Sequence, residues 1–243
     1  MRVAAILPAA GLGIRMGRAS AERAGTSRKQ FMLLDGSPIL LHTARKFASC
    51  AGITEIVVAV RPEDKQWVGE LLAREITNKP VRVVEGGNSR QESVENALHS
   101  LAPDTDYVAV HDAVRPFIDV ETIERAIREA AETGAAIVGI VPVDTVKQVT
   151  RAQSSRTRVR GTILREKLVL AQTPQVFRYD LLRKAFEAAR RDGFTGTDEA
   201  SLVERLEQVE VTVVPGTDRN IKITKPGDMD LARLFLQQQT ARN

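Results

Sequence analysis

The stretch AAILPAAGLGIRMG, residues 4–17, joins an apolar run to a loop of small residues. The run stops at Pro8, and Gly11, Gly13 and then Arg15 follow it. A continuous apolar run is typical of a strand buried on both faces. Small residues let backbone N–H groups approach a ligand, and consecutive N–H groups suit phosphate oxygens. Because a guanidinium adds two-pronged contacts, the stretch predicts a strand that ends at a phosphate-binding loop.

Beyond this stretch, short apolar runs alternate with helical patterns. Strands are predicted at residues 2–8, 55–60, 81–87, 107–112, 135–143 and 209–216. Helices are predicted at residues 38–50, 62–77, 89–101, 119–134, 179–193, 198–207 and 226–239. Such alternation favours an α/β fold, a mostly parallel, Rossmann-like sheet flanked by helices. Ligands of these sheets bind at the carboxyl ends of the strands.

The helix ends carry recognisable signals. Ser89 is the expected N-cap of its helix, and Glu92 three residues later completes a capping-box pattern. Asp119 is the expected N-cap of the next helix, and Gly134 its expected end. Pro38 and Pro62 stand in the first turns of two further helices, where proline is tolerated.

The alternation breaks after Val143, where polar and apolar residues alternate around a Ser/Arg-rich turn. This pattern predicts a two-stranded ribbon, Thr145–Thr150 against Val159–Leu164. An isolated ribbon is only marginally stable in water. We therefore expect residues 145–164 to form a protruding β-arm that packs on a second subunit, within a single domain over residues 1–243 and a homodimer.

Composition narrows the class of protein. The chain has 243 residues, 43% of them hydrophobic, and a formal net charge of +4 from 35 basic and 31 acidic residues. A mildly basic balance without a long Lys/Arg block favours anionic ligands over nucleic acid. One cysteine, Cys50, and three histidines give no metal-ligand spacing. With no membrane-spanning run and no secretory leader, the expected location is the cytoplasm.

Better-known glycine loops fit the opening stretch poorly. The dinucleotide fingerprint needs a third glycine where Met16 stands, and Gly17 comes one residue late. The phosphate-loop motif needs Lys and Ser/Thr after its glycine, which is absent. Lys29, in RKQF at residues 28–31, adds a second cation, so the pattern favours a triphosphate over a nicotinamide. The alternatives are a strand-ending turn and two surface cations.

Several blocks along the chain resemble one family. Besides LPAAGLGIRMG and RKQF, they are GGNSRQESV at 86–94, VHDAVRPF at 110–117, VPVDTVK at 141–147, TILRE at 162–166, LAQTPQVF at 170–177, TDEAS at 197–201 and NIKIT at 220–224. In this order they resemble the nucleotidyltransferases that make CDP-polyols, more narrowly the 2-C-methyl-D-erythritol 4-phosphate cytidylyltransferases. The chain departs from the family in its long 17–27 insert, in Arg28 where a proline is usual, and in Asn88 where some members are acidic.

The resemblance implies attack by a polyol phosphate oxygen on the α-phosphorus of CTP, with loss of pyrophosphate. It implies that Arg15 and Lys29 hold the triphosphate and stabilise the transition state. It also implies a nucleotide site whose backbone donors come from Ala10, Gly11 and Gly13 and whose cytosine is framed by Gly87, Asn88 and Ser93. Ser93 is alternatively an ordinary serine of an early helical turn.

The second substrate site follows from the same resemblance. Arg165 and Lys222 match the family's catalytic cations that grip the substrate 4-phosphate. The accompanying hydroxyls are those of Thr145, Thr173 and Thr197. Asp112, at the end of a predicted strand, suits Mg²⁺ as cofactor, or else orders the ribose or the substrate hydroxyls.

Three other functions stay open at this level. Ribitol-5-phosphate cytidylyltransferase shares the fold and nucleotide site, and the block spacing leans towards methylerythritol phosphate. A non-catalytic nucleotide-binding regulator would not need four convergent cations. A dehydrogenase would need the missing third glycine.

Overall fold

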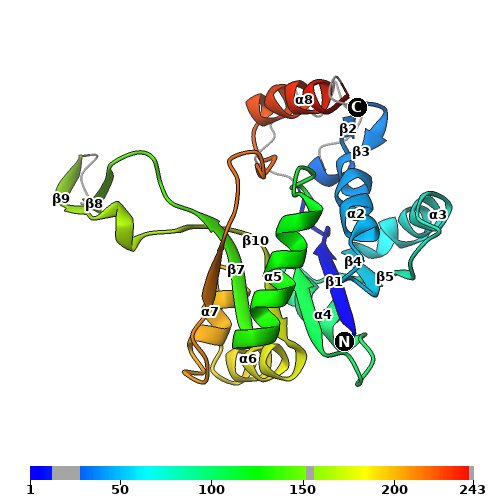
Figure 1. Ribbon diagram of the computed structural model, residues 1–243, viewed down its shortest axis with the longest axis horizontal. Coiled ribbons are helices and arrows are strands. Elements are labelled where there is room, and N and C mark those ends of the chain that lie inside the picture. Colours follow the sequence, from blue (N-terminus) through cyan, green and yellow to red (C-terminus); the bar gives the residue numbers. More distant parts are fainter. Residues whose placement is uncertain (13–27, 152–155, 241–243) are drawn as a thin grey trace.

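In the ranges that the computed structural model describes, residues 1–12, 28–151 and 156–240, seven strands form one central sheet (Figure 1). Their order is β11-β7-β10-β6-β1-β4-β5. The strands are β1 (Val3–Pro8), β4 (Glu55–Val60), β5 (Val81–Glu85), β6 (Tyr107–Val110), β7 (Ala135–Ile140), β10 (Leu170–Arg178) and β11 (Thr212–Pro215).

β1 lies inside this sheet and pairs in parallel with both β4 and β6. Its side chains enter two apolar layers, with Leu7 in one and Ile6 in the other. This double burial explains why its sequence is a continuous apolar run. β4 with β5 and β7 with β11 are also parallel, whereas β10 runs antiparallel to β6 and β7. The expected mostly parallel sheet is therefore confirmed.

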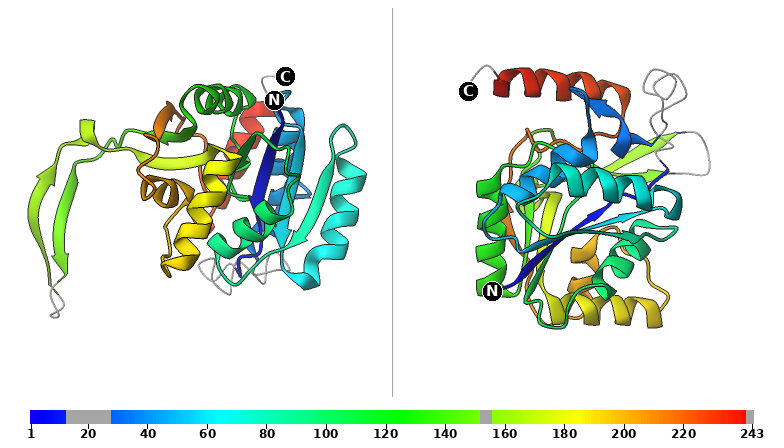
Figure 2. Two further views of the ribbon diagram at one scale, coloured as in Figure 1. Left: turned by 90° about the horizontal axis from the view of Figure 1, so that it is seen from below. Right: turned by 90° about the vertical axis from the view of Figure 1, so that its right-hand side faces the viewer.

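Helices cover both faces of the sheet (Figure 2). One apolar layer contains residues of α2 (Ile39–Ser49), α3 (Lys65–Glu75) and α5 (Val120–Thr133). The other contains residues of α4 (Arg90–His99), α6 (Tyr179–Arg191) and α7 (Glu199–Glu204). A third cluster joins α8 (Pro226–Thr240) to the short hairpin of β2 (Leu33–Leu34) and β3 (Ser37–Pro38). None of the helices in the described ranges is long and apolar enough to cross a bilayer.

The predicted helix caps are largely confirmed. Asp119 accepts a hydrogen bond from the backbone N–H of Thr122, and Gly134 ends α5 with a φ of 90°. The Ser89 side chain accepts from the N–H of Glu92. The Glu92 carboxylate, however, accepts from the N–H of Asn88 at 2.7 Å. In a capping box the Glu92 side chain would accept from the N–H of the N-cap, Ser89. Here it accepts from the preceding residue, so it also holds the loop before α4.

Two turns of 3₁₀ helix bear on the site. η3 (Pro62–Asp64) precedes α3, so the helix predicted from Pro62 begins as a 3₁₀ turn. η2 (Lys29–Phe31) follows the residues that the structure does not describe and places Lys29 at its first position. A third such turn, η4 (Arg165–Lys167), follows the predicted arm.

The predicted ribbon is present. β8 (Val146–Arg151) pairs antiparallel with β9 (Thr157–Ile163) in a separate two-stranded sheet, with a register irregularity at Gln148/Val149. It extends away from the central sheet on the left of Figure 1, and the left-hand view of Figure 2 shows the same separation. Among residues 145–164 whose exposure the structure describes, none is buried. The arm therefore lacks a core of its own within one chain.

Candidate active site

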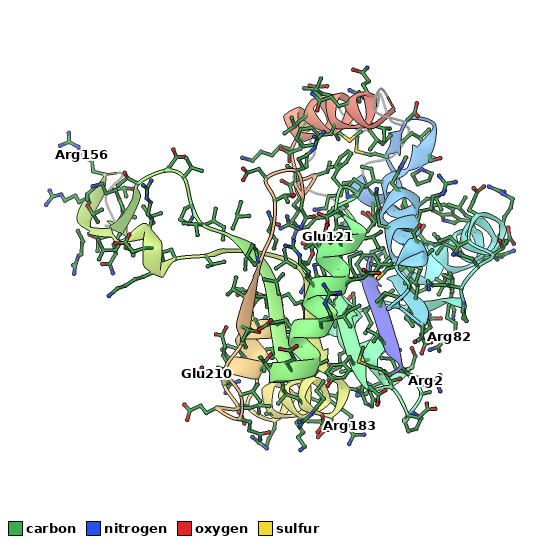
Figure 3. The ribbon with its side chains drawn as sticks, viewed as in Figure 1. Arg2, Arg82, Glu121, Arg156, Arg183 and Glu210 are labelled. Atoms are coloured by element: carbon green, nitrogen blue, oxygen red, sulfur yellow. The ribbon has the colours of Figure 1, made fainter. Side chains whose placement is uncertain are left out.

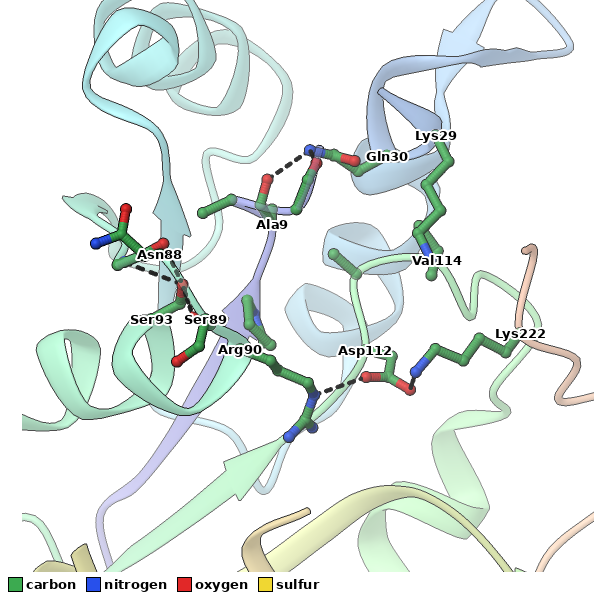
Figure 4. Close-up of a pocket in the computed structure, with 15 residues that line it drawn as sticks. Ala9, Lys29, Gln30, Asn88, Ser89, Arg90, Ser93, Asp112, Val114 and Lys222 are labelled. Carbon is green, nitrogen blue, oxygen red and sulfur yellow. Dashed lines mark hydrogen bonds and ion pairs between the residues drawn. The ribbon is translucent and has the colours of Figure 1, made fainter. Parts of the chain in front are cut away.

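A cavity of about 220 Å³ opens where β1, β5 and β6 end (Figure 4). This is the edge at which parallel sheets bind ligands. Loops that follow these strands line it, together with η2 and one residue of the 220–224 segment. The lining residues are Pro8, Ala9, Ala10, Gly11, Lys29, Gln30, Gly87, Asn88, Ser89, Arg90, Ser93, Asp112, Ala113, Val114 and Lys222.

The loop after β1 presents backbone to this cavity. A Cβ on Gly11 would meet no atom of the described residues within 4 Å, so this part of the chain leaves room for a ligand to approach the backbone closely. The buried Gln30 amide holds the loop, because its Nε2 donates to the carbonyls of Ala9 at 2.7 Å and Gly11 at 2.9 Å. Gly13 and Arg15, which were predicted to bind the nucleotide, lie outside the described residues.

The loop after β5 packs tightly on the loop after β1. A Cβ on Gly86 would lie 2.6 Å from the Cβ of Ala10, a separation that only glycine permits. The Ser93 hydroxyl accepts from the N–H of Gly87 at 3.1 Å and donates to the carbonyl of Ser89 at 2.8 Å. Ser93 therefore shapes the loop that carries Gly87 and Asn88, and all three line the cavity.

Asp112 carries the densest set of charge contacts at the cavity. Its carboxylate accepts from Arg90 Nε and Arg115 Nε, each at 3.2 Å, and pairs with Lys222 Nζ at 2.9 Å. The side chain is 8% exposed. Burial opposes its charged form, but Arg90, Lys222 and Arg115 outweigh burial and hold the pKa of Asp112 well below its usual range. Asp112 is thus a carboxylate bound by three cations.

A fully buried carboxylate lies behind this cluster. Arg90 Nη1 donates to both oxygens of Glu199, at 2.7 and 2.9 Å. Burial raises the pKa of Glu199, and the adjacent Arg90 opposes that rise. Arg90 and Glu199 belong to two of the family-like blocks, GGNSRQESV and TDEAS, but neither residue was predicted to be in the site. Their separation of 109 positions gives no local signal for the pair.

Thr173 holds the Asp112 backbone and is itself in contact with His111. The Thr173 hydroxyl accepts from the N–H of Asp112 at 3.1 Å and contacts Nδ1 of His111 at 3.0 Å. His111 is fully buried, and burial lowers its pKa to about 4, so the ring is neutral at neutral pH. The Thr173 hydroxyl, predicted to contact substrate, is engaged in this support.

Two of the four predicted catalytic cations meet at the cavity. Lys29 comes from η2 and Lys222 from the segment before α8. In Figure 4 both side chains lie on the same side of the cavity as Asp112, opposite Asn88 and Ser93. Arg165 is in η4 and donates to the carbonyl of Val143 at 3.2 Å. Thr145 and Thr197 are exposed, and neither they nor Arg165 line the cavity of this chain.

The arrangement suits an anionic ligand. Among the described residues, Lys29, Arg90 and Lys222 line the cavity with a single carboxylate, Asp112, so cationic side chains outnumber anionic ones in this part of the wall. Exposed backbone at Gly11 adds hydrogen-bond donors that phosphates accept. In the described part of the chain no group of three His, Cys, Asp or Glu side chains could hold a metal ion alone.

Known proteins are similar to this chain over almost its whole length. The family model of 2-C-methyl-D-erythritol 4-phosphate cytidylyltransferase matches residues 3–238. A protein of that name from Solibacter usitatus is 68% identical over 243 residues, covering 100% of this chain and 99% of the relative. One from Acidobacterium capsulatum is 50% identical over 243 residues, covering 100% of both chains.

Solved structures match over nearly the whole chain. The 4-diphosphocytidyl-2C-methyl-D-erythritol synthase of Anaerococcus prevotii superposes with a TM-score of 0.82 at 28% identity, covering 97% of this chain and 98% of that one. The 2-C-methyl-D-erythritol 4-phosphate cytidylyltransferase of Thermus thermophilus gives a TM-score of 0.76 at 30% identity, covering 98% and 100%. On this evidence, the chain belongs to the 2-C-methyl-D-erythritol 4-phosphate cytidylyltransferase family.

Proposed function

We infer that this chain transfers CMP from CTP to 2-C-methyl-D-erythritol 4-phosphate, giving 4-diphosphocytidyl-2-C-methyl-D-erythritol and pyrophosphate. The observation that carries the inference is the family match over residues 3–238. A phosphate oxygen of the acceptor forms a bond to the α-phosphorus of CTP, and the bond from that phosphorus to pyrophosphate breaks. The nucleophile is already an anion, so no general base is needed. The chemical task is to stabilise gathering negative charge.

We propose that the triphosphate lies against the backbone of Ala10 and Gly11, with Lys29 as one of its cations. The open space at Gly11 and the place of Lys29 in the cavity wall support this. Arg15 and Gly13 keep the triphosphate roles implied by the family resemblance. Fixed cations lower the barrier because they are positioned before charge develops and need no reorganisation.

We propose that Gly87 and Asn88 frame the cytosine. The Ser93 hydroxyl supports that role through its hydrogen bond with Gly87, whose backbone it holds in place. A slot lined by backbone would reject purines by size. Ser93 then contributes to base recognition by fixing the loop, in addition to any contact of its own.

At the acceptor end, we propose that Lys222 and Arg165 bind the 4-phosphate, with Thr145, Thr173 and Thr197 supplying hydroxyls. Lys222 is held at the cavity by its 2.9 Å contact with Asp112. Because Thr145 directly precedes β8, Arg165 begins η4 just after the arm, and neither lines the cavity of its own chain, we assign both to the cavity of a partner chain.

This assignment requires a homodimer built through the arm. Val149, Val159, Ile163 and Leu164 are exposed on or beside the arm, and Val149 directly opposes Val159 in its register. Exposed apolar side chains gathered on one projection are typical of an interface. Sedimentation at micromolar concentration should give a dimer. A fully active monomer would contradict the proposal.

Mg²⁺ is the proposed cofactor, with Asp112 as its protein ligand. Mg²⁺ commonly uses one or two carboxylates and takes its other ligands from water and substrate phosphates, which fits a cavity whose described residues include one carboxylate, Asp112. When bound, the ion would neutralise phosphate charge. In the present structure the Asp112 carboxylate is shared by Arg90, Arg115 and Lys222, so a bound Mg²⁺ would share this carboxylate with those cations or replace one of them.

A pyrophosphate-release assay tests the function. We expect the highest kcat/KM with CTP and methylerythritol phosphate, compared with other nucleotides and with ribitol 5-phosphate. A higher value for ribitol 5-phosphate would transfer the assignment to that acceptor. Nucleotide binding without turnover would instead indicate a non-catalytic regulator. The single domain over residues 1–243 and the cytoplasmic location are retained as proposals, the latter favoured by the one buried free thiol, Cys50.

A further inference from the structure

Lys29 lies between two neighbours that attach the same short turn to different parts of the molecule. On one side, Gln30 hydrogen-bonds the loop after β1. On the other side, Arg28 Nη1 donates to Oδ2 of Asp64 and lies 3.7 Å from Oε1 of Glu63. The turn itself is closed by the N–H of Phe31 donating to the carbonyl of Arg28 at 3.0 Å.

The acceptor of this contact is well fixed. The Asp64 side chain is 2% exposed, and its Oδ1 accepts from Nε1 of Trp67 at 3.1 Å. Trp67 meets the Phe31 ring edge-on, with ring centroids 4.7 Å apart. The guanidinium of Arg28 lies 5.2 Å from the same Phe31 centroid. Arg28 is thus held by a buried carboxylate and by an aromatic ring of its own turn.

This set of contacts points away from direct phosphate binding by Arg28. Its guanidinium is engaged with Asp64 and Glu63, and Arg28 does not line the cavity, whereas Lys29 and Gln30 do. Asp64 ends η3 and precedes α3, an element of the apolar core. The contact therefore connects the start of the turn to the body of the protein.

We propose that Arg28 is a positioning residue, whose contact with Asp64 fixes the turn so that Lys29 is presented to the nucleotide phosphates. The proposal rests on the proposed role of Lys29. Removing Arg28 takes away the cation that faces the buried Asp64 carboxylate and leaves it its hydrogen bond from Trp67, and the residue before the turn loses its connection to η3. A displacement of about 1 Å in a catalytic group can cost on the order of 10²-fold in rate.

A double-mutant cycle tests the proposal. Arg28→Ala, Lys29→Ala and the double variant are assayed for kcat and for KM towards CTP and towards methylerythritol phosphate. We expect Arg28→Ala to lower kcat/KM for CTP by about 10- to 100-fold and to leave KM for methylerythritol phosphate unchanged. In the Lys29→Ala background the same change should cost less than about twofold, because a residue that acts through Lys29 has nothing left to position.

Matched variants separate positioning from general stability. Asp64→Asn should reproduce the kinetic defect of Arg28→Ala. Arg28→Lys should recover part of the activity, since an ammonium can pair with Asp64 without covering the Phe31 ring. It also provides the measurement if Arg28→Ala does not fold. Arg61→Ala, which removes a neighbouring half-buried partner of Glu63, is the control and should behave as wild type.

The outcomes are distinguishable. If Lys29→Ala has wild-type turnover, the proposed role of Lys29 fails. If Lys29→Ala is impaired and Arg28→Ala is not, only the positioning role of Arg28 is overturned. It is also overturned if Arg28→Ala costs as much in the Lys29→Ala background as in the wild type, or if Arg61→Ala is equally impaired.

Discussion

The cavity and the β8–β9 arm differ in what they bury: the cavity buries a charged group among its partners, whereas the arm leaves apolar side chains exposed. At the cavity, Asp112 is buried and bound by three cations from the same chain. On the arm, the side chains of Val149 and Val159 are exposed, and Arg156 extends outward at its far end (Figure 3). One chain therefore pairs the buried charges beside the proposed nucleotide site, whereas the arm presents apolar surface that a second chain can cover.

The largest expected effect is at the cavity, on the phosphates. Lys29→Ala should lower kcat by on the order of 10²–10³ with any polyol phosphate, because it removes a fixed donor where charge develops. Pyrophosphate release under saturating substrates measures this loss. Lys65→Ala changes an exposed lysine that pairs with Glu85 and should retain full turnover. If Lys29→Ala keeps its turnover, Lys29 is not a catalytic cation, and the cavity does not use it to stabilise phosphate charge.

The buried groups beneath the cavity should make stability depend on pH. Burial lowers the pKa of His111 from 6.5 to about 4. Between these two pH values the unfolded chain binds a proton on His111 that the folded chain does not. The contribution of the neutral His111 to the free energy of unfolding is therefore complete above pH 6.5 and is lost as the pH falls towards 4. The loss should be about 3 kcal/mol of unfolding free energy.

Urea unfolding at pH 7 and pH 4.5 measures this change. His111→Gln should show a smaller loss than wild type, because its side chain does not titrate. His99→Gln, at an exposed position at the end of α4, is the control and should follow wild type. Equal pH dependence in all three proteins would show that His111 does not carry the effect. No arm residue with described exposure is buried, so the pH effect should belong to the body alone.

At the arm, Arg165→Ala should raise KM for methylerythritol phosphate and leave the Kd of CTP near wild type. A lost charge-assisted contact is worth roughly 1.5–3 kcal/mol. Arg165→Lys should recover little of the affinity for methylerythritol phosphate, because an ammonium cannot make the bidentate contact of a guanidinium with a phosphate. Calorimetric titration of CTP alone and acceptor kinetics separate these effects. Arg158→Ala, further out on β9, is the matched control.

Mixing two inactive proteins sharpens the same prediction. If Arg165 serves the partner's cavity, an equal mixture of Lys29→Ala and Arg165→Ala chains should regain activity after subunit exchange. Half the dimers would be mixed, and about a quarter of all sites would then carry neither defect. If Arg165 served its own chain, every site would keep one defect. Absence of recovery despite demonstrated exchange would reject the shared site.

The smallest expected effect is a loss of stability at the start of α5, outside both regions, and it serves as a reference for the kinetic effects predicted above. Asp119→Ala removes the N-cap of α5, whose side chain accepts from Thr122 N–H at 2.6 Å. It should cost about 1 kcal/mol of unfolding free energy and leave kcat, KM and dimerisation unchanged. Thermal unfolding and kinetics on the same sample check this. A changed KM for either substrate would mean that the kinetic effects predicted above are not specific to the site.

Much of the fold could be predicted from local sequence patterns. The continuous apolar run of β1 predicted a doubly buried strand, and Asp119 and Gly134 marked the ends of α5. Alternating residues predicted the ribbon of β8 and β9. These features depend on neighbours within a few positions, because burial of a strand, a cap or a hairpin follows from backbone periodicity and local hydrogen bonding. The family blocks predicted the reaction by resemblance.

Tertiary structure alone decided which side chains meet. Arg28 pairs with Asp64 across 36 positions, and Arg90 with Glu199 across 109. It also decided that the Thr173 hydroxyl supports Asp112 and that Arg165 lies away from the cavity of its own chain. The physical reason is that an ion pair of buried groups forms only where packing brings distant segments together and excludes water. Periodicity reports which face of an element is buried, and packing determines what lies against that face.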